Sequence, residues 1–446
     1  MFSSISFLYL FLPLCLFFYY ITPKYKNWIL FIFSLIFYSI DGVFTLILLS
    51  IVLAYINGLL IEKYNKKIFI LAIFLTLIPL FYFKYTNFFI NNINILLKTN
   101  IKIKEIMLPL GISFFTFQII SYLADVKKYK KAEHNFLNLA LYICFFPQLV
   151  AGPIVKYANI KEQIKNRKTS INQVSEGVLY FLLGLCKKVL IANQLSEIWK
   201  LYNLNNTTIV FTWIYGISYT MYVYFDFSGY SNMAIGLGKM FGFELPLNFN
   251  YPLIANSIKD FWKRWHITLS SFFKEYVYIP LGGSRYGKIK TIRNLFIVWF
   301  LTGFWHGANW TFIFWGLYFF ILLVIEKFII KDRLNKNIQR LFTLFLVIIS
   351  FILFGANSLS EFTLTIKNLF TGLIINKETI FIIKNYGFII LISMIFSTPI
   401  CKIIYQKIKD KKISIILEPI FIIISLLLCT SYLVNGSFNP FLYFIF

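Results

Sequence analysis

The residues most suited to chemistry are two histidines that stand in aromatic, apolar sequence. The first, His306, lies in the segment 303–310, Gly-Phe-Trp-His-Gly-Ala-Asn-Trp, between the apolar runs 294–302 and 311–325. An imidazole at the depth of a bilayer must be buried in protein or face a water-filled cavity, because an unpaired one in lipid is costly. A neutral imidazole, with a reference pKa of about 6.5, can take a proton from an attacking hydroxyl. His306 is therefore the first candidate for a catalytic base.

The second histidine, His266, lies in the segment 258–276, whose apolar residues recur at helical spacing. Charged residues occupy much of the remaining surface, so we expect one amphipathic helix that lies in the membrane interface or packs over the bundle. His266 borders the apolar face of this helix, between Trp262 and Leu269, and its ring can face the protein interior. We expect it to support His306.

The residues beside His266 are suited to binding a nucleotide. Indole rings stack on adenine and cations bind phosphates, and both kinds occur together at Trp262, Lys263, Arg264 and Trp265. The alternative is that these side chains only anchor an interfacial helix.

A third polar segment, 224–232, follows the apolar run 209–225 and contains Asp226 and Ser228. An aspartate at such a place should be paired or hydrated, which fits the lining of a cavity. A cap or turn at the end of a helix is the alternative.

Metal chemistry is not expected. The remaining histidine, His134, stands in a basic connector, where we expect it to be solvated, and two histidines without an HExxH arrangement are too few for a zinc site. The five cysteines lie singly inside apolar runs and are expected to be packing residues. The sequence contains neither a Gly-x-Ser-x-Gly elbow nor a Walker loop. Acid–base work by histidine is the simplest interpretation.

The elements that must position these residues are membrane helices. The chain has 446 residues, of which 59% are hydrophobic and 20% aromatic, and this composition excludes an ordinary soluble globule. Long apolar runs recur from end to end and predict about ten to twelve spans, some of them tilted, broken or re-entrant. We expect an all-α polytopic protein with one integral membrane domain over residues 1–446, in which 1–107 are scaffold spans.

The net charge is +25, because 43 lysines and arginines outnumber 18 acidic residues, and the basic residues stand mostly in short connectors between apolar runs. This placement indicates membrane topology and contact with anionic lipids, and it does not indicate nucleic-acid binding. The basic stretch 402–412 predicts that the next span, 413–434, runs outward and leaves the C-terminal tail on the outer side.

The order of these motifs resembles the membrane-bound O-acyltransferase (MBOAT) family, above all the membrane subunits of bacterial alginate and peptidoglycan O-acetyltransferases. The resemblance runs from about residue 108 to the C-terminus, so that 108–446 would be the catalytic core. It is carried by four segments, Tyr224–Ser231, Phe261–Ser270, Glu275–Gly283 and Trp305–Gly307.

The resemblance implies a ring of helices around a tunnel, in the cytoplasmic (inner) membrane of a bacterium. Acetyl-coenzyme A would donate acetyl at the cytoplasmic mouth, and a periplasmic serine-esterase (SGNH) partner would complete transfer to an extracytoplasmic glycan, with peptidoglycan preferred over alginate. The family's catalytic histidine falls on His306 and its supporting polar residue on His266. Asp226, Ser228 and Asn309 would line the tunnel.

The aromatic tail 439–446 contains Tyr443. Taken alone, such a tail is typical of an interfacial aromatic belt. It also resembles a tyrosine-containing C-terminal motif of these acetyltransferases and of small partner peptides in teichoic-acid D-alanylation. That resemblance implies that Tyr443 carries the acyl group.

Two other functions stay open. One is D-alanyl transfer to teichoic acid, with a carrier-protein thioester as donor. The other is a transporter or flippase for lipid-linked sugars, which would predict internal repeats that the sequence does not display.

Overall fold

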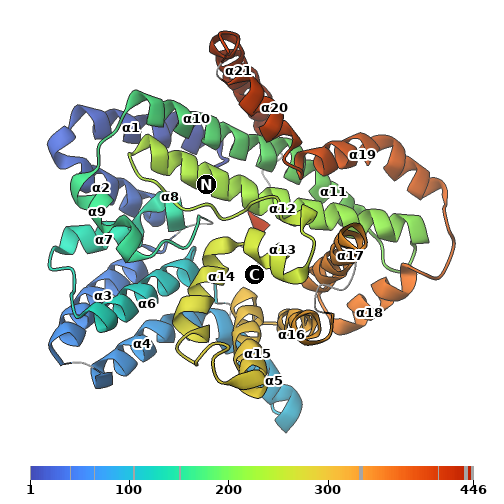
Figure 1. Cartoon of the computed structure of the whole chain (residues 1–446), viewed down its shortest axis with the longest axis horizontal. Coiled ribbons are helices and arrows are strands. Elements are labelled where there is room, and N and C mark those ends of the chain that lie inside the picture. Colours follow the sequence, from blue (N-terminus) through green and yellow to red (C-terminus); the bar gives the residue numbers. More distant parts are fainter. Residues whose placement is uncertain are drawn as a thin grey trace. The chain divides into compact units, whose positions relative to one another are not determined.

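The computed structural model describes residues 2–40, 42–64, 66–103, 106–149, 152–330, 335–409, 411–435 and 440–442, and the regular elements in these ranges are all helices (Figure 1). Within these ranges, six helices are long and apolar enough to cross a membrane: 44–64, 67–97, 310–329, 336–355, 377–396 and 414–434. A bent pair, 7–21 and 23–39, makes a seventh if it counts as one span. The predicted all-α polytopic membrane protein is thereby confirmed.

The difference from the ten to twelve expected spans arises because other apolar runs form shorter or less apolar helices. The described part of the run 136–151, for example, folds as α7 (Phe136–Cys144) and α8 (Phe146–Leu149), with Phe145 between them. Pro147 is the second residue of the short helix, in the first turn, where its missing N–H costs nothing. This run is thus one of the broken ones that the sequence predicts among its apolar runs.

The chain divides into two compact units. The N-terminal unit comprises residues 6–181 and 233–246, and the second unit, which we call the histidine unit, comprises 1–5, 182–232 and 247–446. The prediction of one membrane domain with scaffold spans up to residue 107 stays a prediction.

The N-terminal unit is a bundle in which α3, α4 and α6 pack on one another and α2 packs on α7 (Figure 1). His134 lies in its predicted connector with a 70% exposed side chain, and its Nε2 is 3.1 Å from Oε2 of Glu62. The helices are α1 (Leu12–Ile21), α2 (Lys26–Ser39), α3 (Phe44–Tyr64), α4 (Lys66–Leu80), α5 (Thr86–Leu97), α6 (Ile112–Tyr129), α7, α8, α9 (Tyr157–Asn166) and most of α10 (Ile171–Cys186).

The histidine unit contains both candidate histidines of the apolar segments. Its helices are α11 (Asn193–Leu201), the first three quarters of α12 (Ile209–Met240), α13 (Ile258–Arg264), α14 (Ile267–Phe273), α15 (Gly287–His306), α16 (Trp310–Ile325), α17 (Lys336–Gly355), α18 (Leu359–Asn368), α19 (Lys377–Phe396), α20 (Ile400–Ile408) and α21 (Ser414–Val434). A π-helical segment, η4 (Lys187–Ala192), precedes α11.

Two glycines set the packing of α15 against α16. A Cβ placed on Gly303 would lie 3.1 Å from Cα of Gly316, and closer still to the carbonyl oxygen of Phe312. Small residues at such a contact let two membrane helices approach closely. The approach brings the C-terminal end of α15, with His306, against α16.

The structure corrects two expectations about helix ends. Asp226 does not follow the end of a helix, because α12 continues to Met240; the cap-or-turn alternative is therefore wrong. The segment 258–276 is not one amphipathic helix, since α13 and α14 are separated at Trp265 and His266. His266 has a φ of 42°, in the left-handed region, and this breaks the helical course.

We expect Gly303→Ala to destabilise the α15–α16 pair by about 1–2 kcal/mol, because the added methyl overpacks a backbone contact. Thermal unfolding of the purified protein in detergent should show a midpoint lowered by a few degrees. The matched control is Gly387→Ala in α19, where a Cβ meets only Ile383 Cγ2 at 4.0 Å. An equal response of the two variants would contradict the close approach.

Candidate active site

His306 is the last residue of α15 and is buried, with 2% of its surface exposed. Aromatic rings from the next two helices surround it: the ring centroid is 4.8 Å from that of Trp315 in α16 and 5.4 Å from that of Phe354 in α17. The imidazole thus lies in an apolar environment from which bulk water is excluded.

His266 lies in the same aromatic cluster. It is fully buried, and its ring centroid is 4.7 Å from that of Phe227 in α12 and 6.0 Å from that of Trp305 in α15. The Trp305 ring is also 4.9 Å from the ring of His306. The two histidines named from the sequence therefore contact one shared indole, although their catalytic roles stay predictions.

Asn248 orients His266, and sequence reasoning missed this residue. Its Oδ1 lies 3.1 Å from Nδ1 of His266 and accepts hydrogen bonds from the backbone N–H (3.3 Å) and the hydroxyl (2.9 Å) of Thr268. Because the Thr268 N–H can only donate, the facing atom of Asn248 is the amide oxygen, and Nδ1 of His266 must donate to it. The lone pair of His266 is then on Nε2, which has no hydrogen-bond partner among the described residues.

Burial keeps His266 uncharged. The ring lies outside the six candidate spans, and desolvation lowers its pKa from 6.5 to about 3. A neutral imidazole with a fixed tautomer can accept a proton or a hydrogen bond at Nε2 over the whole physiological pH range.

The four residues proposed to bind a nucleotide divide into two pairs. The two indoles are buried. The ring centroid of Trp262 lies 4.6 Å from that of Trp299, and the ring centroid of Trp265 lies 5.0 Å from that of Phe351. The cations are accessible: Lys263 is exposed, and Arg264 is half-buried with its Nε 2.9 Å from Oδ1 of Asp260. Their binding to a nucleotide stays a prediction.

Asp226 forms a buried ion pair with Lys188, which sequence reasoning also missed. Both side chains are fully buried, and Nζ of Lys188 lies 2.5 Å from Oδ1 of Asp226. Ser228 is fully buried, and its hydroxyl has no hydrogen-bond partner in the described part of the chain. Asn309 caps α16 by accepting from the N–H of Thr311 at 3.2 Å. That these residues line a tunnel stays a prediction.

Tyr443 lies outside the described residues, but the three residues 440–442 before it are described. The backbone N–H of Leu442 donates to Oδ2 of Asp226 at 2.8 Å, and Nζ of Lys188 donates to the carbonyl oxygen of Pro440 at 3.3 Å. The Phe441 ring is 5.7 Å from that of Phe227, the residue that also contacts His266.

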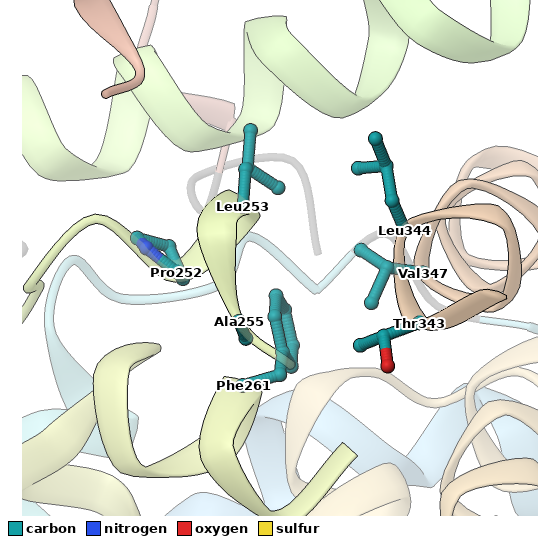
Figure 2. Close-up of a pocket in the computed structure, with 7 residues that line it drawn as sticks. All are labelled: Pro252, Leu253, Ala255, Phe261, Thr343, Leu344 and Val347. Atoms are coloured by element: carbon teal, nitrogen blue, oxygen red, sulfur yellow. The ribbon is translucent and has the colours of Figure 1, made fainter. Parts of the chain in front are cut away.

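A small apolar pocket lies elsewhere in the histidine unit (Figure 2). It leaves no space that a water molecule could occupy, so it is too small to be a ligand pocket. Neither histidine is among its lining residues, which are Pro252, Leu253, Ala255, Phe261, Thr343, Leu344 and Val347. We assign it no part in the chemistry.

The low pKa of His266 predicts a specific loss of stability in acid. The folded ring stays neutral, whereas the unfolded ring is protonated below about pH 6.5. Protons therefore favour the unfolded state, and the free energy of unfolding falls by about 2 kcal/mol as the pH falls from about 7 to 5. In His266→Gln this contribution should disappear, and the thermal midpoint should depend less on pH. His134→Gln, at an exposed site, is the control; equal pH dependence of wild type and His266→Gln would contradict the burial of His266.

Comparisons with known proteins identify the family of the chain. The family model of the membrane-bound O-acyltransferases matches residues 18–360, so the similarity begins well before residue 108, where the sequence resemblance was placed. The chain is 39% identical over 376 residues to the "Probable alginate O-acetylase" of Pseudomonas aeruginosa, with 80% of this chain and 72% of that protein covered.

Two further relatives have different named acceptors. The "Peptidoglycan O-acetyltransferase" of Helicobacter pylori is 38% identical over 371 residues, 73% of this chain and 70% of that protein. The "Teichoic acid D-alanyltransferase" of Bacillus subtilis is 31% identical over 242 residues, 51% of this chain and 60% of that protein. The family match and these identities show that the chain is a multi-pass O-acyltransferase and belongs to the membrane-bound O-acyltransferase family.

Proposed function

We propose that this enzyme takes acetyl from acetyl-coenzyme A on the inner side of the bacterial cytoplasmic membrane and delivers it to an extracytoplasmic glycan. A periplasmic partner of the serine-esterase (SGNH) kind makes the last transfer. The observation that carries the proposal is the pair of buried histidines on Trp305, of which His266 has a fixed tautomer. Such a site provides a proton acceptor in a water-poor environment, as thioester transfer requires.

In the first step His306 acts as the general base. It takes the proton of an attacking hydroxyl as the oxygen bonds to the thioester carbonyl carbon, and it returns that proton to the sulfur as the carbon–sulfur bond breaks. His266 supports the step by accepting a hydrogen bond at Nε2 from a bound substrate. The apolar rings around both histidines protect the thioester from hydrolysis by bulk water.

We propose Tyr443 as the first acceptor. Its phenol, with a pKa of about 10, is a better leaving group than a serine alcohol, so acetyl can pass from thioester to phenyl ester to a partner serine. In each transfer the new ester bond forms as the old bond to the leaving group breaks, and the leaving group takes up a proton. The support for this role is that residues 440–442 are bound within the histidine unit.

For the donor we propose that Lys263 and Arg264 bind phosphate groups of coenzyme A, since both are accessible. Trp262 and Trp265 would border the nucleotide while they pack on the aromatic core. Asp226, Ser228 and Asn309 are proposed to line the path of the acetyl group.

Peptidoglycan is the acceptor we propose, ahead of alginate or another exopolysaccharide. Identities of 38% and 39% to the peptidoglycan and alginate enzymes do not separate these acceptors. The lower identity of 31% to a D-alanyltransferase makes acetyl the favoured group. Family membership leaves no support for the transporter alternative.

His306→Gln and His306→Ala should lower glycan acetylation by at least about 100-fold, because the base is lost while the fold remains. Mass spectrometry of alkali-labile esters on envelope glycans, with and without the gene, measures this loss and identifies the acceptor. The control is His134→Ala, at the exposed histidine, with equal amounts of each variant in the membrane. Retained acetylation in the His306 variants would contradict the proposal, and a loss of D-alanyl in place of acetyl would assign the chain to teichoic-acid modification.

Tyr443→Phe should abolish transfer to the glycan, because phenylalanine lacks the oxygen that accepts acetyl. The matched control is Tyr432→Phe in α21, which removes a hydroxyl from a tyrosine that is 42% exposed. The same mass spectrometric assay applies. Normal acetylation in Tyr443→Phe would return this residue to the aromatic belt.

A further inference from the structure

We propose that Lys188 and Asp226 form a tail clamp: a buried ion pair that binds the backbone of residues 440–442 and so positions these residues beside the histidine cluster. The inference rests on the proposed role of the tail in transfer. Lys188 and Asp226 act as positioning residues in the clamp, because their side chains hydrogen-bond to the backbone of the tail.

The contacts of the clamp are made to the backbone. Asp226 accepts from the N–H of Leu442 with one oxygen and faces Nζ of Lys188 with the other. Lys188 in turn donates to the carbonyl oxygen of Pro440. The acceptor and the donor that the tail needs are therefore supplied by the two members of one ion pair.

The burial of these groups explains why they occur together. A carboxylate and an ammonium lose hydration when they are buried, and their mutual attraction compensates only if further hydrogen bonds satisfy the remaining positions. The backbone of the tail inside the protein has the same need, because its N–H and C=O groups require partners there. In this structure the tail backbone supplies the further hydrogen bonds that the ion pair needs, and the ion pair supplies partners for the N–H of Leu442 and the C=O of Pro440.

An aromatic contact links the clamp to the histidines. Pro440 is exposed, whereas Phe441 and Leu442 are buried, so the tail enters the protein between the first two of these residues. The Phe441 ring is 4.4 Å from that of Tyr230 and 5.7 Å from that of Phe227. Since the Phe227 ring is 4.7 Å from His266, a single ring separates the bound tail from the candidate active site. Tyr443 follows Phe441 by two positions in the sequence.

The clamp is tested first by hydrogen exchange of the Leu442 amide in the full-length protein in detergent, resolved by fragmentation mass spectrometry. The variant is the double substitution Lys188→Met with Asp226→Leu, which removes both charges together and leaves no unpaired buried ion. We expect exchange at Leu442 to become at least 10-fold faster while α12 and α15 stay protected. The control is Lys200→Ala with Glu197→Ala, which removes an exposed ion pair of the same unit.

A second pair of variants tests the clamp from the tail and leaves the ions in place. Leu442→Pro removes the N–H that Asp226 accepts, whereas Leu442→Ala keeps it. Exchange at Phe441 should rise at least 10-fold more in the proline variant than in the alanine variant. This comparison decides the matter even if the double variant of the ion pair does not fold.

The outcomes separate the clamp from the proposed function. Unchanged protection of the tail in both the double variant and Leu442→Pro would overturn the clamp. Release of the tail with full glycan acetylation would overturn its positioning role. Tyr443→Phe should keep the tail protected and lose acetylation; if it keeps acetylation, the carrier role of Tyr443 fails, while the exchange data still decide the clamp.

Discussion

Polar groups enclosed by aromatic and aliphatic side chains must find partners within the protein, and this constraint shapes the histidine unit. His266 meets it through Asn248, whose single amide oxygen contacts the imidazole and both donors of Thr268. Lys188 and Asp226 meet it through one another and through the backbone of residues 440–442. In both cases the partner comes from a segment distant in the sequence, so the polar contacts also fix how these segments are arranged.

The same constraint bears on catalysis. An apolar interior makes a charged imidazole costly and leaves a neutral one, and the neutral ring is the form that can accept a proton. The close approach of Gly303 and Gly316 places His306 among rings of α16 and α17, and Trp305 contacts both histidines. Rigid aromatic packing of this kind holds reacting groups in place at little further entropic cost, because the side chains are already ordered when a substrate arrives.

Particular residues separate what could be predicted from what could not. His266, His306 and Asp226 were identified as candidates because an ionisable side chain in apolar sequence is conspicuous. Lys188 was missed although it also stands in an apolar run, since the adjacent Lys187 makes the pair look like a connector. Asn248 carries no local signal at all, because an asparagine in a non-helical segment is ordinary unless its partner is known.

The sequence by itself determined the helical membrane architecture and the family, and it named the two histidines as candidates, because these depend on composition, on periodicity and on short motifs that are local in the chain. Only the tertiary structure decided the tautomer of His266, the break that gives this residue a φ of 42°, the length of α12 and the ion pair that binds the tail. The physical reason is that these features depend on contacts between residues far apart in the sequence. A hydrogen bond or an ion pair between residues up to 252 positions apart depends on how helices pack, and no local pattern records that arrangement.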